Sequence, residues 1–142
     1  MSLRSNVARS AESSLIQVIP TGKALGAEVC NVDLGSFDDW AFASFMRALL
    51  KHQVLIVRGQ RLNERDIAAF SRRFGDLDWA PVQETGRRFV DGMPEIYIVS
   101  NVKVNGEAIG SLGAGEAVWH TDMSYLDTPP IASAELSRMW RP

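Results

Sequence analysis

The feature that most constrains the fold is a continuous apolar run, Val54–Val57, which lies between two segments of helical periodicity. A run without polar alternation is typical of a strand that is buried on both faces. Upstream of it, Ser36 begins a predicted helix, and Asp39 follows three residues later as a capping-box-like partner. We therefore expect a strand packed against a helix whose core-facing residues are Phe42, Phe45, Met46, Leu49 and Leu50.

A second helix is predicted after the apolar run. Asn63 is its expected N-cap, Asp66 stands three residues later, and Gly75 lies where a helix-ending glycine belongs. The apolar residues of this segment again recur at helical spacing, which indicates one buried face. The residues expected on that face are Ile67, Phe70 and Phe74.

Short segments rich in β-branched and apolar residues predict the strands. Asn105-Gly106 stands between two extended segments and is the usual signature of a hairpin turn. The stretch 76–94 has no clear period and predicts a long loop, of the kind that is usually functional or disordered. The predicted strands are 15–19, 27–34, 54–57, 96–99 and 131–136.

The candidate functional motif is Trp119-His120-Thr121-Asp122. Side chains two residues apart on a strand point to the same face, so a strand here would bring the imidazole of His120 and the carboxylate of Asp122 to one point. These groups are two of the three ligands in the triad of two His and one carboxylate that holds non-haem Fe(II). The spacing alone is a weak signal, because a surface His near an ordinary Asp gives the same pattern.

Other reactive residue types are explained more simply. His52, the only other histidine, lies at the predicted end of the first helix, where it favours the helix dipole or donates to the last carbonyls. A site that uses His52 as a third ligand is a less favoured alternative. Cys30 is expected to act as a small buried apolar residue. Arg72-Arg73 and Arg87-Arg88 are expected to be solvated, or to hold an anion if they lie near a metal site.

Composition narrows the class of protein. A length of 142 residues predicts one domain, and a net charge of −2 gives no electrostatic case for nucleic acid or an anionic membrane as partner. The single cysteine excludes an internal disulfide framework and predicts a reducing, cytoplasmic location. No apolar run approaches the length of a membrane span. Residues 1–14 lack the apolar region of a secretory signal, so we expect a flexible tail.

Four separated motifs resemble the TauD/TfdA (taurine dioxygenase-type) family: Val54–Gln60, Ala69–Gly75, Trp119–Asp122 and Thr128–Pro130. The resemblance covers nearly all of the chain after about residue 15. It implies an α+β, mainly β fold, a double-stranded β-helix or jelly roll with two flanking helices. It also implies an Fe(II)- and 2-oxoglutarate-dependent dioxygenase, in which oxidative decarboxylation of 2-oxoglutarate is coupled to hydroxylation of a substrate C–H bond.

The resemblance assigns roles to individual residues. His120 and Asp122 are similar to the proximal His and the carboxylate of the iron site, and His52 matches a family His that is not a ligand. The distal His of the family, and the Arg and Thr that hold 2-oxoglutarate, have no counterpart in these residues. We therefore expect residues 15–142 to be the N-terminal part of a longer dioxygenase domain, and the jelly roll to be incomplete.

The substrate positions depart from those of family members that oxidise taurine. Where those members have a His and a Tyr after the Phe-Gly motif, this chain has Ala80 and Gln83. Glu116 stands in place of their Asn before the iron-binding His, and its charge would repel an anion. A sulfonate pocket is therefore not implied. Gln83 and Glu116 are candidates for contacts with another small-molecule substrate.

An alternative hypothesis is a non-catalytic remnant, or a fragment that depends on a partner and binds metal weakly or not at all. It follows because two ligands hold a divalent ion less well than three. An incomplete jelly roll would also leave sheet edges and apolar surface exposed. Homo-oligomers, or association through those edges, are therefore expected.

Overall fold

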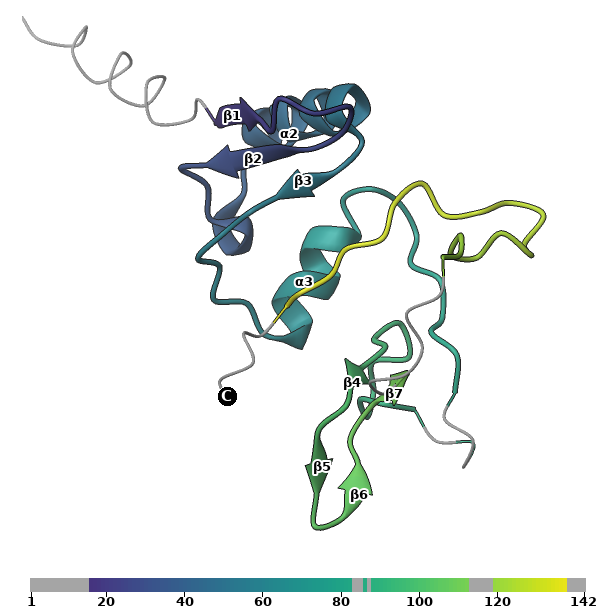
Figure 1. Ribbon diagram of the computed structural model, residues 1–142. Helices are drawn as coiled ribbons and strands as arrows, with labels where there is room; N and C mark the ends of the chain where they lie inside the picture. The colour runs from purple at the N-terminus through teal and green to yellow at the C-terminus, as the bar shows by residue number, and fades with distance from the viewer. Residues whose placement is uncertain (1–15, 83–85, 87, 113–118, 138–142) are drawn as a thin grey trace, which may run out of the picture. The chain divides into compact units, whose positions relative to one another are not determined.

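A computed structural model describes residues 16–82, 86, 88–112 and 119–137 (Figure 1). The chain divides into two compact units, residues 1–66 and 67–142. The first unit contains β1 (Gln17–Pro20), β2 (Ala27–Cys30), the 3₁₀ turn η1 (Leu34–Ser36), α2 (Asp39–His52) and β3 (Leu55–Ile56). The helix α3 (Glu64–Ser71) spans the division, and the second unit contains β4 (Val99–Ser100), β5 (Lys103–Val104), β6 (Glu107–Ala108) and β7 (Ser111–Leu112). The fold is thus a mixture of α and β elements, as the sequence predicts.

The first unit is built on a three-stranded sheet of order β1-β2-β3. Strand β2 pairs antiparallel with β1 and parallel with β3, and α2 connects the two parallel strands. The strands predicted at 15–19, 27–34 and 54–57 are confirmed in position, and each is shifted or shorter. The prediction that the third strand is buried on both faces is wrong. Val54 is 50% exposed and Ile56 40%, because β3 is short and lies at the sheet edge.

Helix α2 packs on β2 and β3. Its N-cap is Asp38, whose carboxylate accepts a hydrogen bond from the backbone N–H of Ala41 at 2.7 Å. Ser36 was the expected start, but it belongs to the preceding 3₁₀ turn, which Asp33 caps. The buried positions recur at helical spacing and are Ala41, Phe45 and Ala48; Leu50, expected inside, is 67% exposed.

The core of the first unit joins the sheet to α2. Ala27 and Val29 of β2 are almost fully buried. The ring of Phe37 lies edge-on to that of Phe45, with centroids 5.6 Å apart, a favourable geometry for aromatic pairs. Gln60 ties the chain after β3 to the chain after β2, because its side-chain amide accepts from the backbone N–H of Leu34 and donates to the carbonyl of Val32.

Helix α3 begins as the sequence predicts. The side chain of Asn63 accepts hydrogen bonds from the backbone N–H groups of Arg65 and Asp66, at 2.8 and 3.0 Å. The carboxylate of Asp66 accepts in return from the N–H of Asn63 at 3.0 Å, which completes a capping box. Phe70, expected on the inner face, is buried. Gly75 follows the helix with a φ of 149°, in the region that favours glycine.

The second unit contains the predicted hairpin. Strands β5 and β6 pair antiparallel across Asn105 and Gly106, whose φ angles of 52° and 85° are those of a type I′ turn. Strands β4 and β7 pair parallel beyond the hairpin. Gly110 allows this approach, since a Cβ there would lie 2.7 Å from the carbonyl oxygen of Ile98.

Three strand predictions in the second unit are wrong in whole or in part. Of 96–99, only Val99 is in a strand, and neither 131–136 nor the described part of the motif, 119–122, forms one. The physical reason is that a strand persists only where its backbone groups find a partner ladder. Within the described residues, these segments have none.

The loop 76–94, as far as the structure describes it, contains no helix or strand, but it is held at several points. The N–H of Ala80 donates to the carbonyl of Pro94 at 2.9 Å, and the guanidinium of Arg88 donates to the carbonyl of Ala80. Arg88 also lies over the ring of Trp79, 5.2 Å from its centroid. Arg88 is therefore engaged rather than freely solvated; its neighbour Arg87 lies outside the described residues.

An ion pair links the end of α3 to the segment before β4. Arg72 donates to the carboxylate of Glu95, whose side chain is only 9% exposed. The expectation that Arg72 is merely solvated is wrong, because a nearly buried carboxylate needs a cationic partner.

No helix in the described part of the chain combines the length and the apolar character required to cross a membrane.

Candidate metal centre

The candidate ligands lie in an irregular segment of the second unit. His120 is in extended coil, and a turn begins at Asp122. The turn is closed by a hydrogen bond from the N–H of Leu126 to the carbonyl of Met123 at 3.1 Å, and the hydroxyl of Tyr125 donates to the sulfur of Met123 at 3.2 Å. Met123 has a φ of 53°, which is uncommon for a residue with a side chain. The expected strand is thus replaced by a turn.

The two side chains nevertheless meet. Nε2 of His120 lies 3.0 Å from Oδ1 of Asp122, within hydrogen-bonding distance. Both side chains are more than half exposed, at 64% for His120 and 57% for Asp122. The convergence expected from the spacing is therefore present, but in this structure the pair opens to solvent.

The geometry and chemistry of the pair fit a divalent cation. Two donor atoms about 2.1 Å from one ion, at right angles to each other, are separated by about 3.0 Å, which matches the distance between the two side chains. An imidazole with a carboxylate is also two-thirds of the donor set of non-haem Fe(II) sites. His120 and Asp122 therefore fit two positions of such a centre.

A third ligand is not found in the described residues. They contain no group of three or more His, Cys, Asp and Glu side chains that could hold a metal ion. His52 is the last residue of α2, and its carbonyl accepts from the N–H groups of Gly26 and Val54, at 2.9 and 2.8 Å. These backbone bonds confirm that His52 lies at the end of the helix, and the role expected for its imidazole stays a prediction.

The expected substrate residues are not placed by the structure. Gln83 and Glu116 both lie outside the described residues. Ala80, aligned with a substrate position, is 9% exposed and is bonded through both its N–H and its carbonyl. It therefore offers a fixed piece of backbone rather than a reactive side chain.

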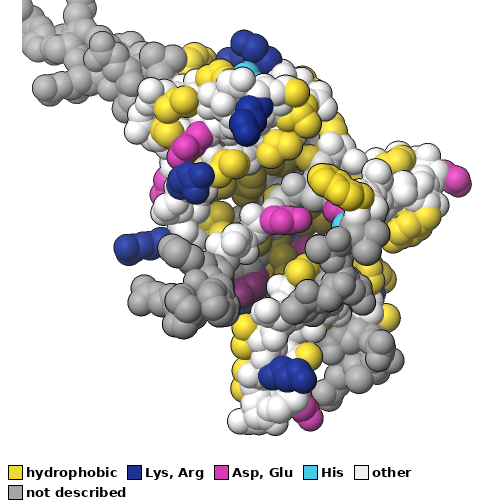
Figure 2. Space-filling view, in the orientation of Figure 1, with side chains coloured by type: hydrophobic (Ala, Val, Ile, Leu, Met, Phe, Trp, Pro, Cys, Tyr) yellow, Lys and Arg dark blue, Asp and Glu magenta, His cyan; other side chains and the backbone are white. Residues whose placement is uncertain are grey.

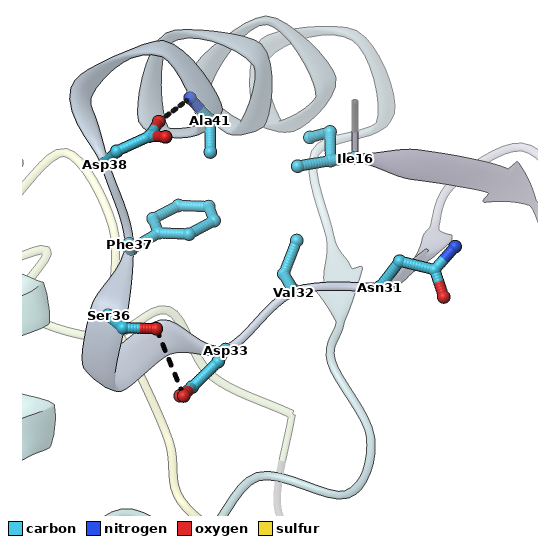
Figure 3. Close-up of a pocket in the computed structure, with 8 residues that line it drawn as sticks. All are labelled: Ile16, Asn31, Val32, Asp33, Ser36, Phe37, Asp38 and Ala41. Atoms are coloured by element: carbon cyan, nitrogen blue, oxygen red, sulfur yellow. Dashed lines mark hydrogen bonds between the residues drawn. The ribbon is translucent and has the colours of Figure 1, made fainter. Parts of the chain in front are cut away.

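A pocket of about 270 Å³ lies in the first unit (Figure 3). Its two carboxylates have structural roles: that of Asp33 accepts from the N–H of Gly35 and the hydroxyl of Ser36, and that of Asp38 caps α2. The ring of Phe37 projects between them in Figure 3. The two carboxylates of the pocket therefore cap the turn and the helix.

Comparison with known proteins decides the family. The family described as taurine catabolism dioxygenase TauD, TfdA family matches residues 17–134. The chain belongs to the TauD/TfdA family. The family resemblance stated from the four motifs is thereby confirmed, and Fe(II) and 2-oxoglutarate are the cofactor and co-substrate that membership implies.

Individual relatives agree with the family. The chain is 31% identical over 121 residues to an (S)-phenoxypropionate/alpha-ketoglutarate-dioxygenase of Delftia acidovorans, a match that covers 78% of this chain and 38% of the relative. It is 36% identical over 110 residues to a pentalenolactone F synthase of Streptomyces avermitilis, covering 73% of this chain and 34% of the relative. The chain thus spans about a third of the length of the curated relatives it matches.

A solved structure shows the same relationship. It is a crystal structure of a Burkholderia xenovorans protein that has been assigned as an alpha-ketoglutarate-dependent taurine dioxygenase. The TM-score is 0.54 at 34% sequence identity, and the match covers 63% of this chain and 32% of that one. The fold of the present chain is therefore related to part of the TauD fold.

Sequence reasoning missed the contacts that organise the loop. Glu95 was not singled out, although its carboxylate is the most buried charged group in any described ion pair. The residues give no signal for it, because Arg72 and Glu95 are far apart in sequence and each resembles an ordinary surface charge. The contact between Trp79 and Arg88 was equally unpredictable from the sequence, since it forms only when the loop folds back on itself.

Proposed function

We propose that this chain contributes the proximal His and the carboxylate of the iron site in an Fe(II)- and 2-oxoglutarate-dependent dioxygenase. The observation that carries the proposal is the 3.0 Å approach of Nε2 of His120 to Oδ1 of Asp122. Membership of the TauD/TfdA family supports it, because the matched residues 17–134 include the pair. Two relatives are named for different small molecules, one as an (S)-phenoxypropionate dioxygenase and the other as a pentalenolactone F synthase, so the proposal specifies a small-molecule substrate only.

In this proposal both side chains act as ligands and not as proton-transfer groups. His120 binds through a neutral ring nitrogen, and Asp122 supplies a negative oxygen that offsets part of the charge of the cation. When bound, Fe(II) with 2-oxoglutarate supplies oxidative decarboxylation of the co-substrate coupled to hydroxylation of a substrate C–H bond. Gln83 and Glu116 are proposed to contact the substrate, by alignment with the family.

The remaining parts of the site come from outside these residues in the proposal. Residues 15–142 form the N-terminal part of a jelly-roll domain, and the distal His and the 2-oxoglutarate-binding Arg come from a further polypeptide segment. The relatives support this division, since the chain spans about a third of their length.

The tail expected at residues 1–14 lies outside the described residues. A cytoplasmic location stays a prediction from the single cysteine.

A second candidate function is a non-catalytic remnant that binds metal weakly or not at all. One observation favours it: the described residues bring no third His, Cys, Asp or Glu to the pair. Affinity for a divalent ion falls with the number of ligands, so two exposed side chains alone would hold it poorly.

Metal binding by the full chain distinguishes the two candidates. Anaerobic equilibrium dialysis with Fe(II) would be run on the wild-type chain and on His120→Ala and Asp122→Ala. His52→Ala and Asp127→Ala are matched controls, because they remove the other histidine and an exposed carboxylate of the same segment. We expect each ligand variant to lose affinity by about tenfold or more and each control to retain it. Equal binding by all five proteins would refute the metal role and favour the remnant.

A further inference from the structure

Met123 lies in the turn that follows the metal pair, His120 and Asp122. Its carbonyl accepts the hydrogen bond from the N–H of Leu126 that closes the turn, at 3.1 Å. Its φ of 53° is uncommon for a residue with a side chain, so the turn holds Met123 in a conformation that such residues seldom adopt. A change at Met123 would therefore act directly on the backbone that carries Asp122.

The side chain of Met123 is held by Tyr125. The hydroxyl of Tyr125 donates a hydrogen bond to the thioether sulfur at 3.2 Å, so the sulfur faces a polar group. A thioether is a weak hydrogen-bond acceptor. Oxidation to the sulfoxide converts this flexible apolar side chain into a polar one, and the contact with Tyr125 is the first to be affected.

The turn is accessible to small oxidants. Met123 itself is half-buried, but its neighbours Ser124 and Tyr125 are exposed. The segment that carries the turn, yellow-green in Figure 1, reaches the surface in Figure 2, where hydrophobic side chains lie among polar ones. The other described methionines lie in α2 and in the loop 76–94. Met123 is the described methionine that stands next to a candidate metal ligand.

We propose that Met123 is an oxidation site that controls the affinity of the metal pair. The oxidant is a hydroperoxide such as hydrogen peroxide. Its O–O bond breaks, one oxygen atom forms a bond to the sulfur, and the other leaves with both hydrogen atoms as water. The thioether loses the two electrons that the peroxide gains. This inference rests on the metal role proposed above for His120 and Asp122.

Oxidation changes the contact that holds the turn. The added oxygen accepts a hydrogen bond more strongly than the sulfur does, so it draws the hydroxyl of Tyr125 away from its present position. Both residues belong to one turn, so the shift disturbs the bond between Leu126 and Met123. The carboxylate of Asp122 then moves relative to His120. Loss of the contacts that orient metal ligands lowers the affinity for metal by about 10–100-fold.

The test compares the affinity for Zn(II) before and after oxidation. The full, metal-free chain would be treated with hydrogen peroxide and EDTA, freed of both, and titrated by calorimetry with Zn(II), a redox-inert probe. Peptide mapping by mass spectrometry would locate the added oxygen. We expect the oxidised wild type to bind Zn(II) about tenfold more weakly than the untreated chain. The two methionine sulfoxide reductases, one for each epimer, should restore the affinity.

Three variants separate Met123 from the remaining methionines. Met123→Leu keeps the approximate size of the side chain and offers no sulfur, so treatment should leave its affinity at the untreated value. Met93→Leu is the matched control, because it removes a methionine from another irregular segment, and its affinity should fall as that of the wild type does. Met123→Gln introduces a polar side chain, and we expect it to lower the affinity without peroxide. Circular dichroism would establish that each variant keeps the wild-type fold.

The contrary results have distinct meanings. An unchanged affinity for Zn(II) in a chain whose Met123 is oxidised overturns the control of metal binding and leaves the metal role intact. Resistance of Met123 to peroxide, or an equal loss of affinity in treated Met123→Leu, overturns Met123 as the site. Absence of Zn(II) binding before treatment overturns both proposals.

Discussion

Nε2 of His120 and Oδ1 of Asp122 lie 3.0 Å apart across the start of a turn. On a strand, the alternation of side chains would have brought the same two groups to one face. Here the backbone itself bends after Asp122, where Met123 takes a φ of 53°. A spacing of two residues thus produces the same convergence through a different local structure.

Metal binding at this pair should weaken on acidification. Imidazole ligates only in its neutral form, so protons compete with the ion for His120, and the affinity falls as the pH is lowered. Titration calorimetry with Zn(II) between about pH 7.5 and about pH 5.5 should show a decline that approaches about tenfold per pH unit at the acid end. A flat profile would show that the imidazole is not a ligand.

Asp38→Ala should destabilise α2. The substitution removes the side-chain acceptor that satisfies the N–H of Ala41, a loss of about 1 kcal/mol for a typical N-cap. Asp38→Asn keeps an acceptor oxygen and is the matched control, with an expected loss of only a few tenths. Urea unfolding followed by far-ultraviolet circular dichroism measures both. The role of Asp38 would be disproved if the two variants unfolded alike.

Arg72→Ala should cost more stability than Glu95→Gln. The first leaves a carboxylate that is 9% exposed without its cation, whereas the second keeps a neutral acceptor for the guanidinium. We expect about 1–3 kcal/mol for Arg72→Ala, with partial recovery when both changes are combined. Hydrogen exchange at the amide of Ala80, which donates to Pro94, reports the opening of this region. The reverse order of the two single variants would contradict the assignment.

Gly110→Ala should disrupt the pairing of β4 with β7. A Cβ at this position would lie 2.7 Å from the carbonyl oxygen of Ile98, which accepts the hydrogen bond of Ser111. The measurement is exchange of the Ser111 amide, which we expect to accelerate by about tenfold or more, for a loss above about 1 kcal/mol. Gly106→Asn is the control, because that site is open and Asn tolerates its positive φ. Equal acceleration in both would exclude the steric explanation.

The helices were predictable because their determinants are local. Asn63 and Asp66 form the expected capping box, and Phe45 is buried at the position that helical spacing assigns to it. The N-cap of α2 was missed by two residues, since Ser36 and Asp38 are both good capping residues. Only the three-dimensional path of the chain decides between them.

The strands were less predictable because each depends on a partner. Val54–Val57 reads as a buried strand, yet its extended part is the short edge strand β3. The segment 131–136 was also predicted as a strand and stays irregular. Contacts between distant charges, such as Arg72 with Glu95, were not predictable at all, since composition does not say which charges meet. For the candidate site, the sequence indicated that His120 and Asp122 lie close together. It did not indicate the turn that begins at Asp122 or the exposure of the two side chains to solvent.

The parallel pairing of β2 with β3 has a consequence for biosynthesis. All the strands of this sheet lie between Gln17 and Ile56, and no later described strand joins it. Synthesis of this stretch takes about 2–8 seconds, and the ladder can close once the stretch has left the ribosome. The nascent chain would then carry a formed sheet and helix while the residues of the metal pair were still being synthesised.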